Sequence, residues 1–263
     1  MVMLYNSFVM REKKTYYSPH KEKDDAIYRP HIFYRLFCGI LRLFFPKNEL
    51  IWATDKPKDG EKYALICNHT QIYAPTYFLL QKEIKPLRLW VNYYFVYFNK
   101  CWGHLKNKVL NTIKGGFLLY PIGFILTPII VLLFRAFNPI PVFHKCEKTE
   151  TMTFAKSVRT LEEDIPLLIF PERTVNPVNK YVYQFNKGFP MLAEKYYQET
   201  GKKLKFYPTY CAQKLRKVVI GKPIEYDPNE SMETQSAKIR AYLENNIKEL
   251  GDSLPEHEPV LYV

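Results

Sequence analysis

The sequence contains little glycine and little cysteine, and each shortage excludes a class of protein. Only 10 of the 263 residues are Gly, which excludes collagen-like and low-complexity chains. The five cysteines are odd in number and no two have C-x-x-C spacing, so neither a disulfide framework nor a zinc site is indicated. The G-x-S-x-G motif of serine lipid hydrolases does not occur either. A reducing compartment and a chain without a metal site are therefore expected.

Acidic residues are also in short supply relative to basic ones. The chain has 26 Asp and Glu against 38 Lys and Arg, a net charge of +12. This excess favours an anionic partner, which is a nucleic acid, a phosphorylated metabolite or an anionic membrane face. Zinc-finger spacing, an RNP motif and a recognition helix are missing, so no nucleic-acid partner is expected. Aromatic residues make up 16% of the chain, which excludes a disordered protein.

The apolar segments alternate between strand-like and helix-like patterns, which predicts an α/β fold with a mixed sheet flanked by helices. A last helix is predicted over about 228–250, with Asp227 as its cap and Gly251 at its end. The α/β domain is expected to cover residues 50–263. Strands are expected at 50–54, 63–67, 86–91, 140–144, 166–170, 204–210 and 217–221, and helices at 73–82, 151–163 and 188–200.

The N-terminal part predicts an amphipathic helix. Residues 1–26 form a polar lead-in, and 27–49 hold a helix that starts near Pro30 and places Arg35 and Arg42 on one face. A basic, aromatic-rich amphipathic helix is typical of the membrane interface. The alternative is a core helix with two exposed arginines.

A second apolar segment, 115–134, contains no charged residue and is long enough to cross a bilayer. Pro121, Pro128 and three glycines interrupt it. A single crossing would place the chain before and after it on opposite sides of the membrane.

Asn68-His69 directly follows a strand that is predicted to be buried. The end of a strand in an α/β protein is a common place for catalytic groups, and a neutral imidazole there can act as a general base. A purely structural His is the alternative.

Two further motifs follow predicted strands or precede helices. The segment F-P-E-R-T follows an apolar strand and carries Glu172, Arg173 and Thr174. Lys187 and Gly188 precede a predicted helix, where free backbone N–H groups favour an anion. The alternative for the first of these motifs is an ordinary strand-to-turn junction.

The order of these motifs resembles that of the glycerolipid acyltransferase family, which includes the 1-acylglycerol-3-phosphate acyltransferases. The resemblance covers about residues 50–225. It implies transfer of a fatty acyl group from coenzyme A or acyl carrier protein to a glycerolipid or lysophospholipid hydroxyl, without any other cofactor. It also implies His69 as general base, Lys145 of P-V-F-H-K as a phosphate ligand, and Glu172 and Thr174 at the acceptor site. Asn68, Arg173, Lys187 and Gly188 are assigned to substrate binding.

The sequence departs from the family pattern at two positions. The family has an Asp five residues after the His, and here Ala74 stands there, with no carboxylate between His69 and Glu83. Arg173 stands where the family usually has Gly, and it is a candidate phosphate contact. Two interpretations follow. In the favoured one the enzyme is active and Glu172 replaces the Asp as partner of His69; in the other the protein binds lipid or acyl donor without transfer.

A shared site constrains the apolar segment. If His69 and Glu172 act together, they lie on one side of the membrane, so 115–134 is expected to be a re-entrant or interfacial hairpin bent at Pro121 and Pro128, or a core element. The expected location is the cytoplasmic face of a membrane, as a peripheral or monotopic protein, with membrane lipids and an anionic surface as partners.

Overall fold

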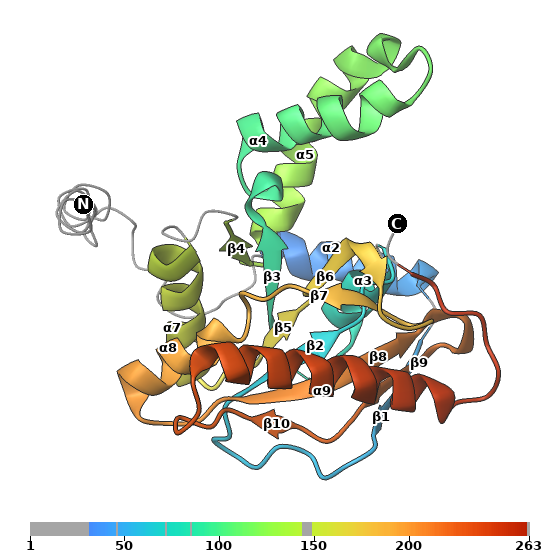
Figure 1. Cartoon of the computed structure of the whole chain (residues 1–263). Coiled ribbons are helices and arrows are strands. Elements are labelled where there is room, and N and C mark those ends of the chain that lie inside the picture. The colour runs from blue at the N-terminus through green and yellow to red at the C-terminus, as the bar shows by residue number, and fades with distance from the viewer. Residues whose placement is uncertain (1–31, 46, 72, 85, 144–148, 262–263) are drawn as a thin grey trace, which may run out of the picture.

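The structure is a computed structural model that describes residues 32–45, 47–71, 73–84, 86–143 and 149–261. Figure 1 shows an α/β body with a helical projection on one side. The predicted lead-in 1–26, the helix start near Pro30 and the predicted phosphate ligand Lys145 lie outside the described residues.

The body is built on a mixed eight-stranded sheet, which confirms the predicted fold class. The order is β1-β9-β8-β2-β5-β3-β4, with β10 beside β8. The neighbours β8, β2, β5, β3 and β4 are parallel, whereas β9 and β10 each run antiparallel to β8. The strands are β1 Glu49–Trp52, β2 Tyr63–Cys67, β3 Arg88–Asn92, β4 Ile140–Val142, β5 Leu167–Ile169, β8 Lys205–Ala212, β9 Lys217–Ile220 and β10 Ile224–Glu225.

Helices cover both faces of the sheet, so alternate residues of the central strand β2 pack into two different apolar clusters. Ala64 and Ile66 of β2 pack in one apolar cluster, and Leu65 and Cys67 pack in the other, as the period of two requires. Helices α7 Ala155–Glu162, α8 Met191–Thr200 and α9 Met232–Asp252 contribute to the first cluster, and α3 Tyr73–Leu80 to the second. In Figure 1, α9 crosses in front of the sheet.

The predicted start of the last helix is wrong. Helix α9 begins at Met232, and the Ser231 hydroxyl caps it by accepting from the Thr234 N–H at 3.3 Å. Asp227 instead accepts from the Asn229 N–H at 3.0 Å in the preceding turn. Both residues are good caps, and the chain uses the later one. Gly251 lies inside the helix, where a Cβ would meet the Tyr181 ring at 2.6 Å.

A short second sheet was not expected from the sequence. Strands β6 Glu172–Pro177 and β7 Tyr183–Phe185 pair antiparallel. This β-hairpin directly follows Pro171, so the E-R-T part of the F-P-E-R-T motif lies on a strand.

The apolar segment 115–134 was predicted to form a hairpin by itself, and this is wrong: it supplies one arm of a longer helical hairpin. The hairpin, residues 98–136, has one arm in α4 Phe98–His104 and the π-helical turn Leu105–Val109, and the other in Gly116–Leu119 and α5 Tyr120–Ala136. The bends predicted at Pro121 and Pro128 are wrong: Pro121 lies in the first turn of α5, where its missing N–H has no helical partner to lose, and Pro128 lies inside the continuous helix.

Two glycines allow the arms of the hairpin to touch. A Cβ on Gly116 would lie 1.8 Å from the Leu110 carbonyl oxygen, and a Cβ on Gly123 would lie 2.9 Å from Leu110 Cδ1. Small residues at such contacts let helices approach closely. Two of the three glycines that interrupt the apolar segment, Gly116 and Gly123, therefore allow close packing at the turn of the hairpin.

Both ends of the hairpin return to one sheet. The first arm follows β3 and the second precedes β4, and these strands are parallel neighbours. By length and composition alone, Gly116–Ala136 is apolar enough to cross a membrane: an 18-residue window within it has a mean hydropathy of 2.4, and 17% of that window is buried. A core helix of this composition would be mostly buried.

Candidate functional site

Asn68 fixes the end of β2 to β8. Its side-chain oxygen accepts from the Cys211 N–H at 2.7 Å, and its amide donates to the Cys211 carbonyl at 3.3 Å. Only 2% of the residue is exposed. The polar atoms of Asn68 thus face the main chain of Cys211, and the residue positions His69 immediately after it.

The His69 ring lies against an aromatic neighbour beyond the end of β2. Its centroid is 5.0 Å from that of Phe170, with the rings near edge-to-face. Burial lowers the pKa of His69 to about 4, because a low-dielectric environment disfavours the imidazolium. The imidazole is therefore neutral at neutral pH, which is the form a general base requires.

Glu172 meets His69 from a segment 103 residues away in the chain. Its carboxylate accepts from the His69 backbone N–H at 2.5 Å and from the Tyr183 backbone N–H at 2.9 Å. Burial raises the pKa of Glu172 to about 7, although these two hydrogen bonds favour the charged form. The sequence led us to expect the imidazole as the partner of Glu172, and the hydrogen bonds that the structure shows run to the main chain.

Ala74 occupies the position at which the resembled family has an Asp. It is fully buried at the start of α3, in the apolar cluster that also contains Cys67 and Tyr77. Its N–H donates to the Thr70 hydroxyl at 3.0 Å. A carboxylate in this position would have to be buried among apolar groups, which is costly.

The other predicted substrate residues lie near Glu172 along the chain. Arg173 is exposed on β6, and Thr174 follows it on the same strand. The Asn186 N–H donates to the Pro171 carbonyl at 2.8 Å, so the motif at Lys187 and Gly188 begins next to F-P-E-R-T. Two of its groups are engaged within the fold: the Gly188 N–H donates to the Asn186 side chain at 2.9 Å, and the Lys187 carbonyl accepts from Ser236 at 2.9 Å.

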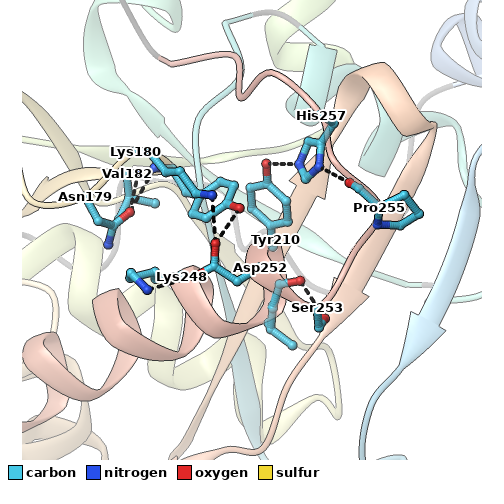
Figure 2. Close-up of polar contacts among 11 residues, drawn as sticks. Asn179, Lys180, Val182, Tyr210, Lys248, Asp252, Ser253, Pro255 and His257 are labelled. Atoms are coloured by element: carbon cyan, nitrogen blue, oxygen red, sulfur yellow. Dashed lines mark hydrogen bonds and ion pairs between the residues drawn. The ribbon is translucent and has the colours of Figure 1, made fainter.

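Tyr210, which precedes Cys211 on β8, contacts the C-terminal segment, as Figure 2 shows. The Tyr210 hydroxyl is 2.8 Å from His257 Nε2, and His257 Nδ1 is 2.8 Å from the Pro255 carbonyl. Since a carbonyl only accepts, Nδ1 donates to Pro255 and Nε2 accepts from Tyr210. Tyr181 packs edge-on against Tyr210 and donates to Asp252 at 2.8 Å.

Sequence analysis missed two supports of the site, Tyr183 and Cys211. Both act through their main chain, so their side-chain types carry no signal. The alternating, aromatic-rich run Y-V-Y-Q-F at 181–185 follows turn-forming residues, and it is the pattern that would have identified the β6–β7 hairpin.

Comparison with protein-family models and with curated proteins finds no match to this sequence. The functional argument therefore depends on the motifs and on the geometry of this chain. Within the described part of the chain, no three His, Cys, Asp or Glu side chains come together as metal ligands.

Proposed function

We propose that this protein is a membrane-associated acyltransferase that moves a fatty acyl group from a thioester to a hydroxyl of a glycerolipid or lysophospholipid. The observation that carries the proposal is the contact between His69 and Glu172, which brings two distant motifs together beyond the carboxyl ends of β2 and β5. That edge of a parallel sheet is where α/β proteins place their ligands.

His69 is the general base in this proposal. The acceptor hydroxyl gives its proton to the neutral imidazole as its oxygen attacks the thioester carbonyl. The tetrahedral intermediate then breaks its carbon–sulfur bond, and the departing thiolate takes the proton from the imidazolium. The new ester and the free thiol leave, and His69 is neutral again. Proton transfer of this kind contributes about 10²–10⁴-fold to rate.

Glu172 is a positioning residue in this scheme. Its carboxylate accepts hydrogen bonds from the backbone N–H groups of His69 and Tyr183. These bonds fix the backbone at His69 and thereby the position of the imidazole. Arg173, exposed beside it, is the proposed contact for a phosphate on the acceptor, because the guanidinium binds phosphate bidentately.

The exposed apolar surface of the helical hairpin supports membrane association. Leu118, Ile125 and Leu132 are each about two-thirds exposed, and an apolar patch of this kind on a folded protein marks an interaction site. Lys106 and Lys108 lie in the π-helical turn of the first arm and Lys114 lies between the arms, where lysines favour an anionic leaflet. The cytoplasmic face of a membrane is the proposed location.

Helix α2, Ile32–Phe44, presents a second apolar face beside the base of α5. Arg42 does not point away from the body, because its Nε donates to the Leu80 carbonyl at the end of α3 at 2.8 Å. Cys38 is buried on the same side, whereas Leu36 and Leu43 are exposed. The helix thus turns apolar residues outward, as an interfacial helix does.

The test is product analysis by mass spectrometry. Purified protein is incubated with vesicles, mixed acyl thioesters of coenzyme A and of acyl carrier protein, and a panel of lysolipids. We expect an acylated lipid from the wild type, at least 100-fold less from His69→Ala, and from Arg173→Ala a raised KM only for acceptors that carry phosphate. Unchanged acyl transfer by His69→Ala would refute the assignment of His69 as the general base.

A second function, lipid or acyl-donor binding without transfer, is favoured by one observation. Ala74 leaves no carboxylate where the resembled family has one, and in a Ser-His-Asp enzyme the loss of the orienting carboxylate lowers kcat about 10⁴-fold. No product with any donor and acceptor, together with retained binding of lysolipid, would favour this function.

A further inference from the structure

A surface cavity of ≈ 520 Å³, open to solvent, lies at the base of the helical hairpin. It is lined by residues that follow β3, residues of the first turn of α4, and residues that follow β4. They include Tyr93, Tyr97, Phe98, Lys100, Phe143 and Met152. The volume is in the range of small-molecule sites, and nothing in the proposed function so far occupies it.

The cavity lies on the same edge of the sheet as His69. In the strand order β2, β5, β3, β4, His69 follows β2 and Glu172 follows β5, whereas the cavity lies beyond β3 and β4. At ~4.8 Å per strand, the cavity is roughly 10–15 Å from the line of β2. A distance of this size is within the length of a long alkyl chain whose reacting end is at His69.

The lining of the cavity is suited to an apolar chain. Tyr93 stacks on Phe143 with centroids 5.0 Å apart, and Tyr97 is 6.5 Å from the same ring. Met152 adds a flexible apolar side chain, which adapts to irregular gaps. Among the lining residues that the structure describes, the polar side-chain groups are the amide of Asn99, the charge of Lys100 and two tyrosine hydroxyls.

The hairpin also connects the cavity with the exposed apolar surface. Phe98 lines the cavity and packs edge-on against Phe124 of α5, with centroids 5.6 Å apart. Beyond this contact α5 exposes Ile125 and Leu132. The arm that carries the exposed apolar residues therefore also contacts a residue of the cavity lining.

We infer that this cavity binds the alkyl chain of a lipid while the head of that lipid lies at His69. The inference rests on the proposed function for the position of the head, and it names the substrate class as a long unbranched chain. The chain belongs either to the acyl donor or to the acceptor lysolipid, and both share the chemistry that the aromatic lining recognises.

The test alters the size of the cavity. Met152→Trp fills it, Tyr97→Ala enlarges it, and Lys58→Trp is the matched control in the exposed loop before β2. Full-length variants are titrated with a fluorescent fatty acid, which is then displaced by hexadecanoyl-coenzyme A in one arm and by hexadecanoyl lysophosphatidate in the other. All titrations use the His69→Ala background, so that no turnover is required.

We expect Met152→Trp to weaken binding of at least one of the two lipids tenfold or more, and Lys58→Trp to bind both as the parent does. The affected arm identifies the source of the chain. Tyr97→Ala is expected to shift selectivity toward longer chains, and it tests the inference even if Met152→Trp fails to fold. Wild-type affinity and selectivity in both cavity variants would overturn it.

Failure of the inference and failure of the proposed function give different results. Chain binding that depends on the cavity, without any transfer by the wild-type protein, would refute the enzyme and keep the cavity. Transfer by the wild type with no effect of either cavity variant would refute the cavity and keep the enzyme.

Discussion

Strand β2 and the helical hairpin are both apolar, but they use their apolar residues in opposite ways. Ala64, Leu65, Ile66 and Cys67 have no exposed surface, because helices cover both faces of the sheet. In the hairpin Leu118 is 70% exposed. The first kind of apolar surface stabilises the fold, whereas the second remains after folding is complete. Hydropathy alone does not distinguish the two, and the packing does.

The largest expected effect separates the two regions by stability. Leu168→Ala removes a fully buried side chain of β5 and is expected to lower the free energy of unfolding by about 2–5 kcal/mol. Leu118→Ala makes the same chemical change on the hairpin and is expected to alter it by less than ~0.5 kcal/mol. Urea unfolding of both variants in the same detergent solution measures the two changes in free energy. Equal losses of stability in the two variants would contradict the distinction between buried strand residues and exposed hairpin residues.

Glu172 is a partly buried carboxyl within the body, and the pH dependence of stability tests its burial. Burial raises its pKa from 4.5 to about 7, so the native state holds a proton that the unfolded state releases. Its contribution to stability is complete below pH 4.5 and is lost as the pH rises through about 7. Relative to Glu172→Gln, the wild type should lose on the order of 3 kcal/mol between pH 4.5 and 8.

Urea unfolding of both proteins at several pH values measures this difference. The matched control is Glu233→Gln, which removes an exposed carboxylate from the first turn of α9. A difference between wild type and Glu172→Gln that stays constant with pH would show that the carboxyl is not buried as described.

The turn of the hairpin is tested by two glycines. Gly116→Ala places a Cβ against the Leu110 carbonyl and is expected to cost about 1–3 kcal/mol. Gly103→Ala meets nothing within 4 Å and, since it lies in α4, is expected to be neutral or to stabilise by up to ~1 kcal/mol. Hydrogen exchange of residues 98–136 measures local stability. Similar exchange in both variants would contradict the described contact.

The smallest expected effect concerns the outer face of the hairpin. Leu118→Asp replaces an exposed apolar group with a charge and is expected to weaken binding to anionic vesicles about tenfold, ~1.4 kcal/mol, with the free energy of unfolding unchanged. Vesicle sedimentation measures it. Leu118→Ile, which keeps the apolar surface, is the control, and wild-type binding by Leu118→Asp would place the contact elsewhere.

The sequence predicted the body better than the hairpin, for a physical reason. Buried strands such as β2 and β5 are short apolar runs between turn residues, and their positions are confirmed. The first arm of the hairpin was missed because Phe98–His104 is held by contacts with α5, including Phe98 on Phe124 and Trp102 on Tyr120, and local sequence does not encode such contacts.

The prolines and the site were harder to predict for related reasons. Pro128 suggested a bend, yet α5 continues through it, and the preceding Thr127 hydroxyl donates to the Gly123 carbonyl at 2.7 Å. At the site, motif order brought His69 and Glu172 together, as the structure does. That Glu172 would meet the main chain of His69 was not predictable, because every residue type presents the same N–H.

The account is tested most directly by measuring which surface enters the bilayer. An environment-sensitive fluorophore is attached at Leu118→Cys on the hairpin or at Lys58→Cys in the exposed loop before β2, in a Cys146→Ser background; the four cysteines in the described part of the chain are buried. With anionic vesicles, the label at 118 should shift to the blue and be quenched by lipid-attached quenchers, and the label at 58 should do neither. A label at 118 that stays in water, or equal quenching at both positions, would contradict the account.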